Sequence, residues 1–287
     1  MYFRWHGFCS VVAQTTQPIH QRKKMIKRAP LAACVLIAGL HNSTAGAEDA
    51  PAAEAASPHT ITGNLGFVSD YRFRGISQTA KRPAIQGGFD YAHSSGIYAG
   101  TWASNVSDYS YTDANMEWDF YGGYNLKLTD DIGLTGGGLY YFYPGGKTGN
   151  GKRWDTFEAN FGGNWKWVSG KLWYSVTDFF GLSDPKSKGS TYIEANVSFP
   201  FSELKTGNAW LDKLTLVGHI GPQKVKNYKD FDYTDWKLGA TYDLKGYLLG
   251  VAYVDTNAKR NFYTLATNRG DKYIGSSTVV LSVSKTF

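Results

Sequence analysis

The sequence has 287 residues, a mean hydropathy of −0.35 and an aromatic content of 16%. No apolar stretch approaches the roughly 20 residues of a membrane-spanning helix, which excludes a helical transmembrane protein but not a β-barrel, whose strands alternate between lipid and lumen. The net charge of +6 comes from basic residues before residue 47, where no acid occurs. The remaining 24 bases balance 24 acids, so the charge does not indicate nucleic-acid binding.

Residues 25–47 have the layout of a secretory signal peptide. Lys27 and Arg28 form a basic start, residues 31–40 form an apolar middle, and Ala45 and Ala47 form a small-residue cleavage pattern. The predicted mature chain therefore begins at residue 48 and crosses the periplasm.

Residues 1–24 are predicted to be an upstream extension or a misassigned start, and residues 48–59 a disordered periplasmic stub. Both cysteines, Cys9 and Cys34, precede the predicted cleavage site, so the mature chain has neither a disulfide nor a thiolate metal site. Cys34 also ends a lipoprotein-like box, but the apolar region before it is too short for export.

The chain after residue 60 is predicted to be all-β, a transmembrane antiparallel up-and-down β-barrel of about 12 strands. Large apolar side chains recur at every second position, as in segment 236–244, where Trp236 and Leu238 share one face and Lys237 the other. The predicted strands are 60–73, 83–93, 96–105, 114–127, 131–143, 153–167, 170–180, 190–200, 212–222, 232–244, 246–255 and 276–287.

Short and long connections alternate along this pattern. Tight hairpin turns such as Ser94-Ser95-Gly96 and Lys245-Gly246 are followed by longer links rich in Gly, Lys and Asp. Short periplasmic turns and longer extracellular loops are typical of outer-membrane barrels. Residues 201–211 are the exception, because this link is long although it falls on the short side.

A soluble β-sandwich is the alternative fold, since its strands also alternate. Its core would be mainly aliphatic, whereas the apolar positions here are rich in aromatic residues close to predicted strand ends. We expect these to form girdles at the membrane interfaces. They are Tyr71, Phe73, Tyr141, Tyr143, Trp165, Trp167, Phe179 and Phe180.

The last predicted strand carries an assembly signal. Val279, Leu281 and Val283 alternate toward Phe287, and outer-membrane barrels commonly close on a strand with such a terminal aromatic residue. Val283 and Phe287 are therefore predicted to be recognised by the barrel-assembly machinery. The closing strand must pair, because an open edge in lipid would leave backbone groups unsatisfied.

Residues 69–79 (SDYRFRGISQT) and 83–106 resemble the signature of the TorF-type porins of Gram-negative bacteria. The close match covers about 40 residues, and the rest of the chain follows only in its alternation and its Gly and aromatic content. The resemblance implies a barrel in the outer membrane, in contact with lipid and lipopolysaccharide. It implies a porin only as far as the family name does.

The predicted strand parity places charged residues of both signs in the lumen. These pore-lining candidates are Asp70, Arg72, Arg74, Asp90, Glu117, Asp119, Glu158, Lys166, Glu194, Lys237 and Asp243. Ionisable groups at membrane depth face a watery cavity or pair with one another. The predicted function is therefore a narrow charged channel for small hydrophilic solutes or ions, and the alternative is a non-conducting barrel with a plugged lumen.

An outer-membrane lipid hydrolase is the rival class. His93 and Ser95 could act as base and nucleophile, but they fall in a predicted periplasmic turn, and Asp90 is poorly spaced to orient the histidine. The loop acids have no calcium-motif spacing, and the sequence predicts no metal site, cofactor or catalytic residue. It does not indicate which solute passes or whether the barrel oligomerises.

Overall fold

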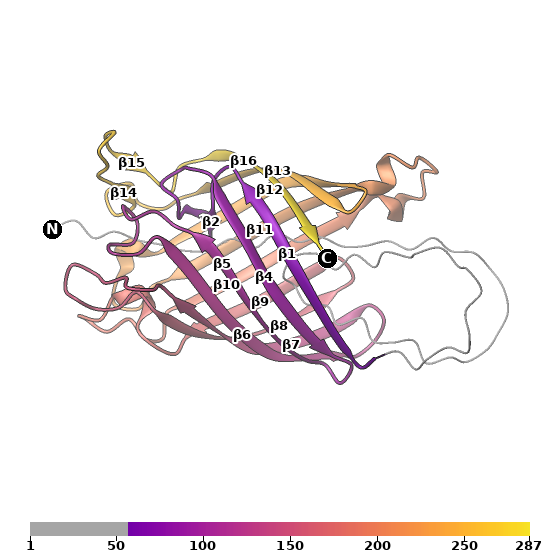
Figure 1. The fold of residues 1–287 in the computed structure, drawn as a ribbon, viewed down its shortest axis with the longest axis horizontal. Helices are drawn as coiled ribbons and strands as arrows, with labels where there is room; N and C mark the ends of the chain where they lie inside the picture. The colour runs from indigo at the N-terminus through magenta and orange to yellow at the C-terminus, as the bar shows by residue number, and fades with distance from the viewer. Residues whose placement is uncertain (1–56) are drawn as a thin grey trace.

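The computed structural model describes residues 57–287 as a closed antiparallel barrel of twelve strands (Figure 1). The strands are β1 (His59–Val68), β4 (Ala84–His93), β5 (Ile97–Asn105), β6 (Met116–Lys127), β7 (Ile132–Phe142), β8 (Thr156–Trp165), β9 (Val168–Ser175), β10 (Thr191–Pro200), β11 (Leu214–Lys224), β12 (Tyr233–Leu244), β13 (Tyr247–Thr256) and β16 (Thr278–Thr286). The all-β fold class and the predicted strand number are confirmed. The predicted extension, signal peptide and most of the stub lie outside the described residues.

The barrel closes between its first and last strands. β1 and β16 pair antiparallel from Asn64 opposite Thr286 to Val68 opposite Ser282. Beyond the strand, the backbone amides of Gly63 and Phe287 each donate to the carbonyl of the other, at 2.8 and 2.9 Å. Full closure leaves no unpaired strand edge in the barrel wall.

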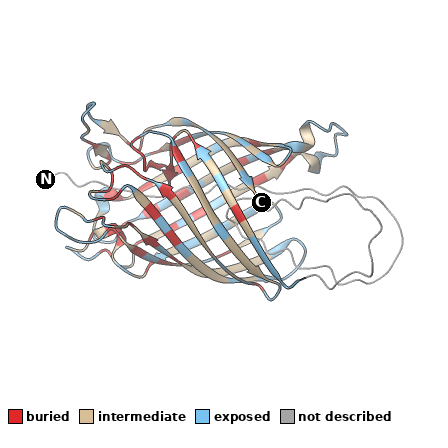
Figure 2. Cartoon of the chain, in the orientation of Figure 1, coloured by how far each residue is buried: buried red, intermediate tan, exposed pale blue. Residues whose placement is uncertain are grey.

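The two faces of each strand differ as the alternation predicts. On β6, Trp118 and Phe120 are exposed on the outer face, whereas Glu117 and Asp119 point inward and are buried. Figure 2 shows buried and exposed positions along the barrel wall. Large apolar side chains such as Phe161 and Leu238 are exposed on the other strands as well, so an apolar surface surrounds the barrel.

Short turns and long loops alternate at the two ends, as predicted. The longer link on the short-turn side holds two 3-10 helices, η2 (Phe201–Leu204) and η3 (Leu211–Lys213). Two more, η1 (Phe179–Gly181) and η4 (Lys229–Phe231), lie in long loops. Among the described residues, no helix is long and apolar enough to cross a membrane.

The first loop, residues 69–83, was predicted partly as strand. β1 ends at Val68, and the chain then forms a separate small hairpin of β2 (Arg72–Phe73) and β3 (Ile76–Ser77). A second small hairpin, β14 (Thr264–Leu265) and β15 (Lys272–Tyr273), lies in the last loop, residues 257–277. The first hairpin turns at Arg74 and Gly75, which have φ of 46° and 81°.

Side chains of the first loop and its neighbours pack into a buried cluster at the long-loop end, which we call the loop core. Its main members are Tyr71, Phe73, Ile76, Tyr111, Tyr141, Tyr143, Trp154, Phe179, Phe180, Phe231, Tyr263 and Ile274. The predicted interfacial girdle is therefore wrong for six residues, Tyr71, Phe73, Tyr141, Tyr143, Phe179 and Phe180. These rings are buried because the loops fold inward, whereas Trp165 is exposed.

Candidate functional site

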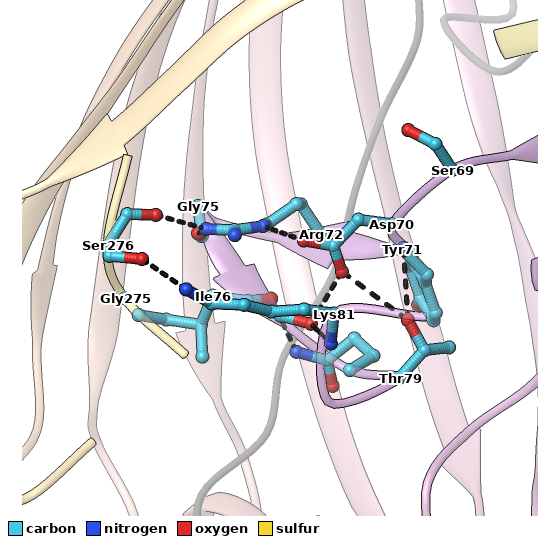
Figure 3. A network of polar contacts seen from close by, with 12 residues as sticks. Ser69, Asp70, Tyr71, Arg72, Gly75, Ile76, Thr79, Lys81, Gly275 and Ser276 are labelled. Atoms are coloured by element: carbon cyan, nitrogen blue, oxygen red, sulfur yellow. Dashed lines mark hydrogen bonds and ion pairs between the residues drawn. The ribbon is translucent and has the colours of Figure 1, made fainter. Parts of the chain in front are cut away.

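The first loop is held by its own polar contacts and by the last loop (Figure 3). The Nε of Arg72 donates to Asp70 at 2.7 Å, and its Nη1 donates to the carbonyls of Gly75 and Ser276 at 2.8 and 2.9 Å. Asp70 also accepts from the hydroxyl of Ser77 at 2.5 Å. The loop is thus a folded element rather than an open strand end.

Arg74 joins the first loop to the barrel wall. Its guanidinium donates to Glu158 on β8 and to Gln223 on β11, both at 2.6 Å, and lies between the rings of Phe73 and Tyr192. Burial lowers the pKa of Arg74, but the charge and hydrogen bond of Glu158, together with Tyr141 and Tyr192, outweigh this and hold the pKa above its ordinary value. The guanidinium therefore stays charged.

Glu117 on β6 accepts hydrogen bonds from tyrosines of the loop core. The hydroxyl of Tyr71 donates to Glu117 at 2.7 Å, and the hydroxyl of Tyr143 donates to its second oxygen. Tyr143 also bonds Tyr111 at 2.6 Å, and Tyr111 donates to Gln78 of the first loop at 2.9 Å. Burial and the neighbouring Glu117 raise the pKa of Tyr71, so this hydroxyl keeps its proton and acts as a donor.

Beneath the first loop lies a cavity of about 230 Å³, which we call the chamber. Arg72 and Arg74 contribute to its roof, and its lining extends to Ser169 and Thr286. Ser169 is the second residue of β9 and Thr286 the last of β16, so the chamber reaches the short-turn end of the barrel.

One wall of the chamber, formed by β9 to β12, carries acids that are already satisfied. Glu194 accepts from Trp173 Nε1 at 2.8 Å and from Asn196 at 3.1 Å. Asp235 accepts from the hydroxyl of Tyr192 at 2.9 Å and from His219 Nε2 at 2.8 Å. A lysine on the same wall, Lys171, lies 5.0 Å from the centre of the Trp173 ring.

The opposite wall, formed by β1 and β4 to β7, carries one acid in the lining, Asp119, while a second lumenal acid, Asp90, is bonded to two lining residues. Asp90 accepts from Asn64 at 3.2 Å and from the hydroxyl of Tyr121 at 2.5 Å. Asp119 lines the chamber at 1% exposure, and within residues 57–287 its carboxyl forms no hydrogen bond or ion pair. Among the described acids of the chamber lining, Asp119 is therefore the one whose carboxyl has no partner, whereas Glu194 and Asp235 each have two.

Nine of the eleven predicted lumenal residues lie inside the barrel or its loop core. Asp70, Arg72 and Arg74 do so from the first loop rather than from a strand. Asp90, Glu117, Asp119, Glu158, Glu194 and Lys237 point inward from strands.

The other two predicted lumenal residues lie at the short-turn end. Lys166 follows the end of β8, with φ of 51°, and its half-exposed side chain approaches Asp131. It was assigned to the wall because the strand was predicted two residues too long. Asp243 accepts from the backbone amide of Gly246 at 2.8 Å and so caps the β12–β13 turn.

The sequence analysis missed several residues of the site, namely Tyr71, Lys171, Trp173, Tyr192, Gln223 and Asp235. Lys171 and Trp173 could have been predicted from strand parity, because alternate positions of β9 point inward. Asp235 lies on the inward parity of β12 with Lys237. Gln223 shares the inward parity of β11 but lies one residue beyond the predicted strand 212–222. Tyr71 lies in the first loop and bonds a partner far away in sequence, so no local pattern indicates it.

The proposed hydrolase residues are not arranged for catalysis. Ser95 lies 2.8 Å from His93 Nδ1, but Asp90 is bonded to Asn64 and Tyr121 instead of to His93. In the part of the chain that the structure describes, no group of three or more His, Cys, Asp or Glu side chains is placed to hold a metal ion.

A family model with the description "Bacterial protein of unknown function (Gcw_chp)" matches residues 52–287. No curated protein matches the sequence.

Among solved structures, the chain is similar to a KdgM porin in complex with disordered oligogalacturonate, with a TM-score of 0.46, 8% identity, and coverage of 79% of this chain and 99% of that one. OccAB3 of Acinetobacter baumannii has a TM-score of 0.40 and 13% identity, over 78% of this chain and 64% of that one. OprD of Pseudomonas aeruginosa has a TM-score of 0.36 and 13% identity, over 80% of this chain and 66% of that one.

Proposed function

The chain belongs to the Gcw_chp family of bacterial proteins of unknown function, and we propose that it is a porin-like outer-membrane barrel for small hydrophilic solutes. The observation that carries this proposal is a chamber with charged side chains in its lining, inside a closed barrel with an apolar outer surface. A soluble protein rarely exposes apolar side chains continuously, whereas a lipid-embedded barrel must do so. The resemblance to TorF-type porins supports the same localisation, in a Gram-negative outer membrane.

The first loop is the element that would control passage. It lies between the chamber and the long-loop end, and Arg74 fastens it to two strands by 2.6 Å contacts to Glu158 and Gln223. Loops that fold inward narrow a barrel, and charged groups at the narrowing select among ions. The chamber charges, including Lys237 and Glu194, would then act on a solute that has passed the loop.

The second candidate is the non-conducting barrel, and the burial of the loop core favours it. Tyr71, Tyr111, Tyr143 and Ile274 are completely inaccessible, so this part of the cross-section is packed as tightly as a protein interior. In this case the lumen would be closed at the long-loop end, and the long loops would serve as an interaction surface.

Lipid and the assembly machinery are the partners that this location requires. The outer faces of the strands would contact lipid and, on the extracellular side, lipopolysaccharide. Phe287 is exposed on the outside next to Gly63, which leaves the predicted assembly signal accessible at the short-turn end.

Single-channel conductance in a planar bilayer tests the proposal. The purified protein should give small, salt-dependent steps, and Arg74→Ala should enlarge them because it releases the first loop from β8 and β11. Lys166→Gln, in a turn, is the matched control and should leave the steps unchanged. If the parent protein and Arg74→Ala both form a folded, heat-modifiable barrel but give no conductance steps, the channel is contradicted and the non-conducting barrel is favoured.

A further inference from the structure

Asp119 is exceptional among the lumenal carboxylates. It points inward from β6 at 1% exposure, and its Oδ1 is buried without a partner. By contrast, Asp90, Glu158, Glu194 and Asp235 each accept at least two side-chain hydrogen bonds. An unsatisfied buried carboxyl is costly, so Asp119 would gain from any donor that enters the cavity from outside the chain, whether water or a solute.

Aromatic rings surround this carboxyl. Trp102 on β5 and Tyr141 on β7 are its register partners on either side, and Tyr121 is the next inward residue of β6. All three line the chamber together with Asp119. Trp102 is further fixed by an edge contact with Tyr71, with ring centres 5.5 Å apart. Ring faces attract cations, and a carboxylate within the same cavity adds to that attraction.

The basic groups of the roof do not compensate Asp119. Arg72 is paired with Asp70 at 2.7 Å, and Arg74 is paired with Glu158 at 2.6 Å. The nearest charged neighbour along the strand is another carboxyl, Glu117, which is held by tyrosine hydroxyls rather than by a base. This wall of the chamber therefore lacks a positive charge.

We propose that the chamber binds a small organic cation whose ammonium or guanidinium group pairs with Asp119 between Trp102 and Tyr121. This assignment names the solute class and rests on the proposed channel function. Ring faces in place of further oxygen ligands favour an organic cation over a bare metal ion. The chamber of about 230 Å³ has room for a molecule of a few heavy atoms.

Calorimetric titration of the detergent-solubilised protein tests the assignment with three probes of matched size. These are ethanolammonium, ethylene glycol and glycolate, which carry a positive, a neutral and a negative group on the same short skeleton. At constant ionic strength, ethanolammonium should bind and the other two should not. Equal heats from ethanolammonium and ethylene glycol would overturn the assignment.

Asp119→Asn should weaken ethanolammonium binding about 10- to 100-fold, because the substitution removes a charge-assisted contact and keeps the side-chain shape. Asp130→Asn is the matched control, since Asp130 is an exposed carboxyl in the β6–β7 turn. Unchanged binding by a folded Asp119→Asn barrel would overturn the assignment. If this variant does not fold, the preference of the parent protein among the three probes decides.

The outcomes separate this assignment from the channel proposal. A barrel that conducts but does not prefer ethanolammonium overturns only the cation site. A barrel that binds ethanolammonium through Asp119 but gives no conductance steps contradicts only the channel.

Discussion

The two ends of the lumen are built from the same alternating strands but differ in their interior. At the long-loop end, rings fill the cross-section and buried charges are paired, as Arg74 is with Glu158. Below the loop core the strands enclose the chamber, which extends toward the short turns and is lined next to the loop core by Asp119, a residue with no partner among the described residues. The difference comes from the connections: the first loop folds inward, whereas the short turns cannot do so and the longer link 201–213 has no buried residue.

Removing one partner of the buried ion pair should destabilise the long-loop end more than any other substitution proposed here. Glu158→Gln leaves Arg74 as a buried cation without its counter-charge, at 5% side-chain exposure. We expect a loss of about 3–5 kcal/mol in the free energy of unfolding, measured by urea titration of the refolded barrel. The double variant Arg74→Gln/Glu158→Gln should recover part of this loss. Equal losses in the single and double variants would show that the uncompensated charge of Arg74 is not what destabilises Glu158→Gln.

Two glycines with positive φ allow the packing at the two ends of the barrel to be compared directly, because one lies at each end. Gly75 has φ of 81°, and a Cβ there would lie 2.4 Å from Thr256 and 2.7 Å from Asp235. Gly246 has φ of 84°, and a Cβ there would meet nothing within 4 Å. Gly75→Ala should therefore cost about 2–4 kcal/mol, from backbone strain plus overpacking, and Gly246→Ala about 1 kcal/mol, from strain alone.

Thermal unfolding followed by circular dichroism checks the glycine pair. Equal shifts in the two variants would mean that the first loop has room to move, and the tight packing of the long-loop end would not hold in solution.

The strands were predictable because their signal is local. A period of two distinguishes the faces of β6 within a few residues, so the inward positions of Glu117 and Asp119 follow from sequence parity. Strand ends are less well defined, and an error of two residues placed Lys166 in the wall rather than in a turn.

The loop core was not predictable in this way. Arg74 and Glu158 are 84 residues apart, and nothing near either residue indicates the other. Aromatic rings near strand ends suit a membrane interface as well as a buried core, because Tyr needs an apolar environment for its ring and a partner for its hydroxyl. Tyr71 and Tyr143 find that partner in Glu117, inside the barrel.

The smallest effect is expected for a lumenal carboxylate that keeps its donors and is bonded to residues of the chamber lining. Asp90 is half-buried and accepts from Asn64 and Tyr121. Asp90→Asn preserves an acceptor for the tyrosine hydroxyl, and water in the lumen can solvate the amide group of this half-buried side chain. Its unfolding free energy should therefore change by no more than about 0.5 kcal/mol in the urea titration used for Glu158→Gln. A loss comparable to that of Glu158→Gln would mean that the lumen around Asp90 is as dry as the loop core, and the contrast between the two ends would disappear.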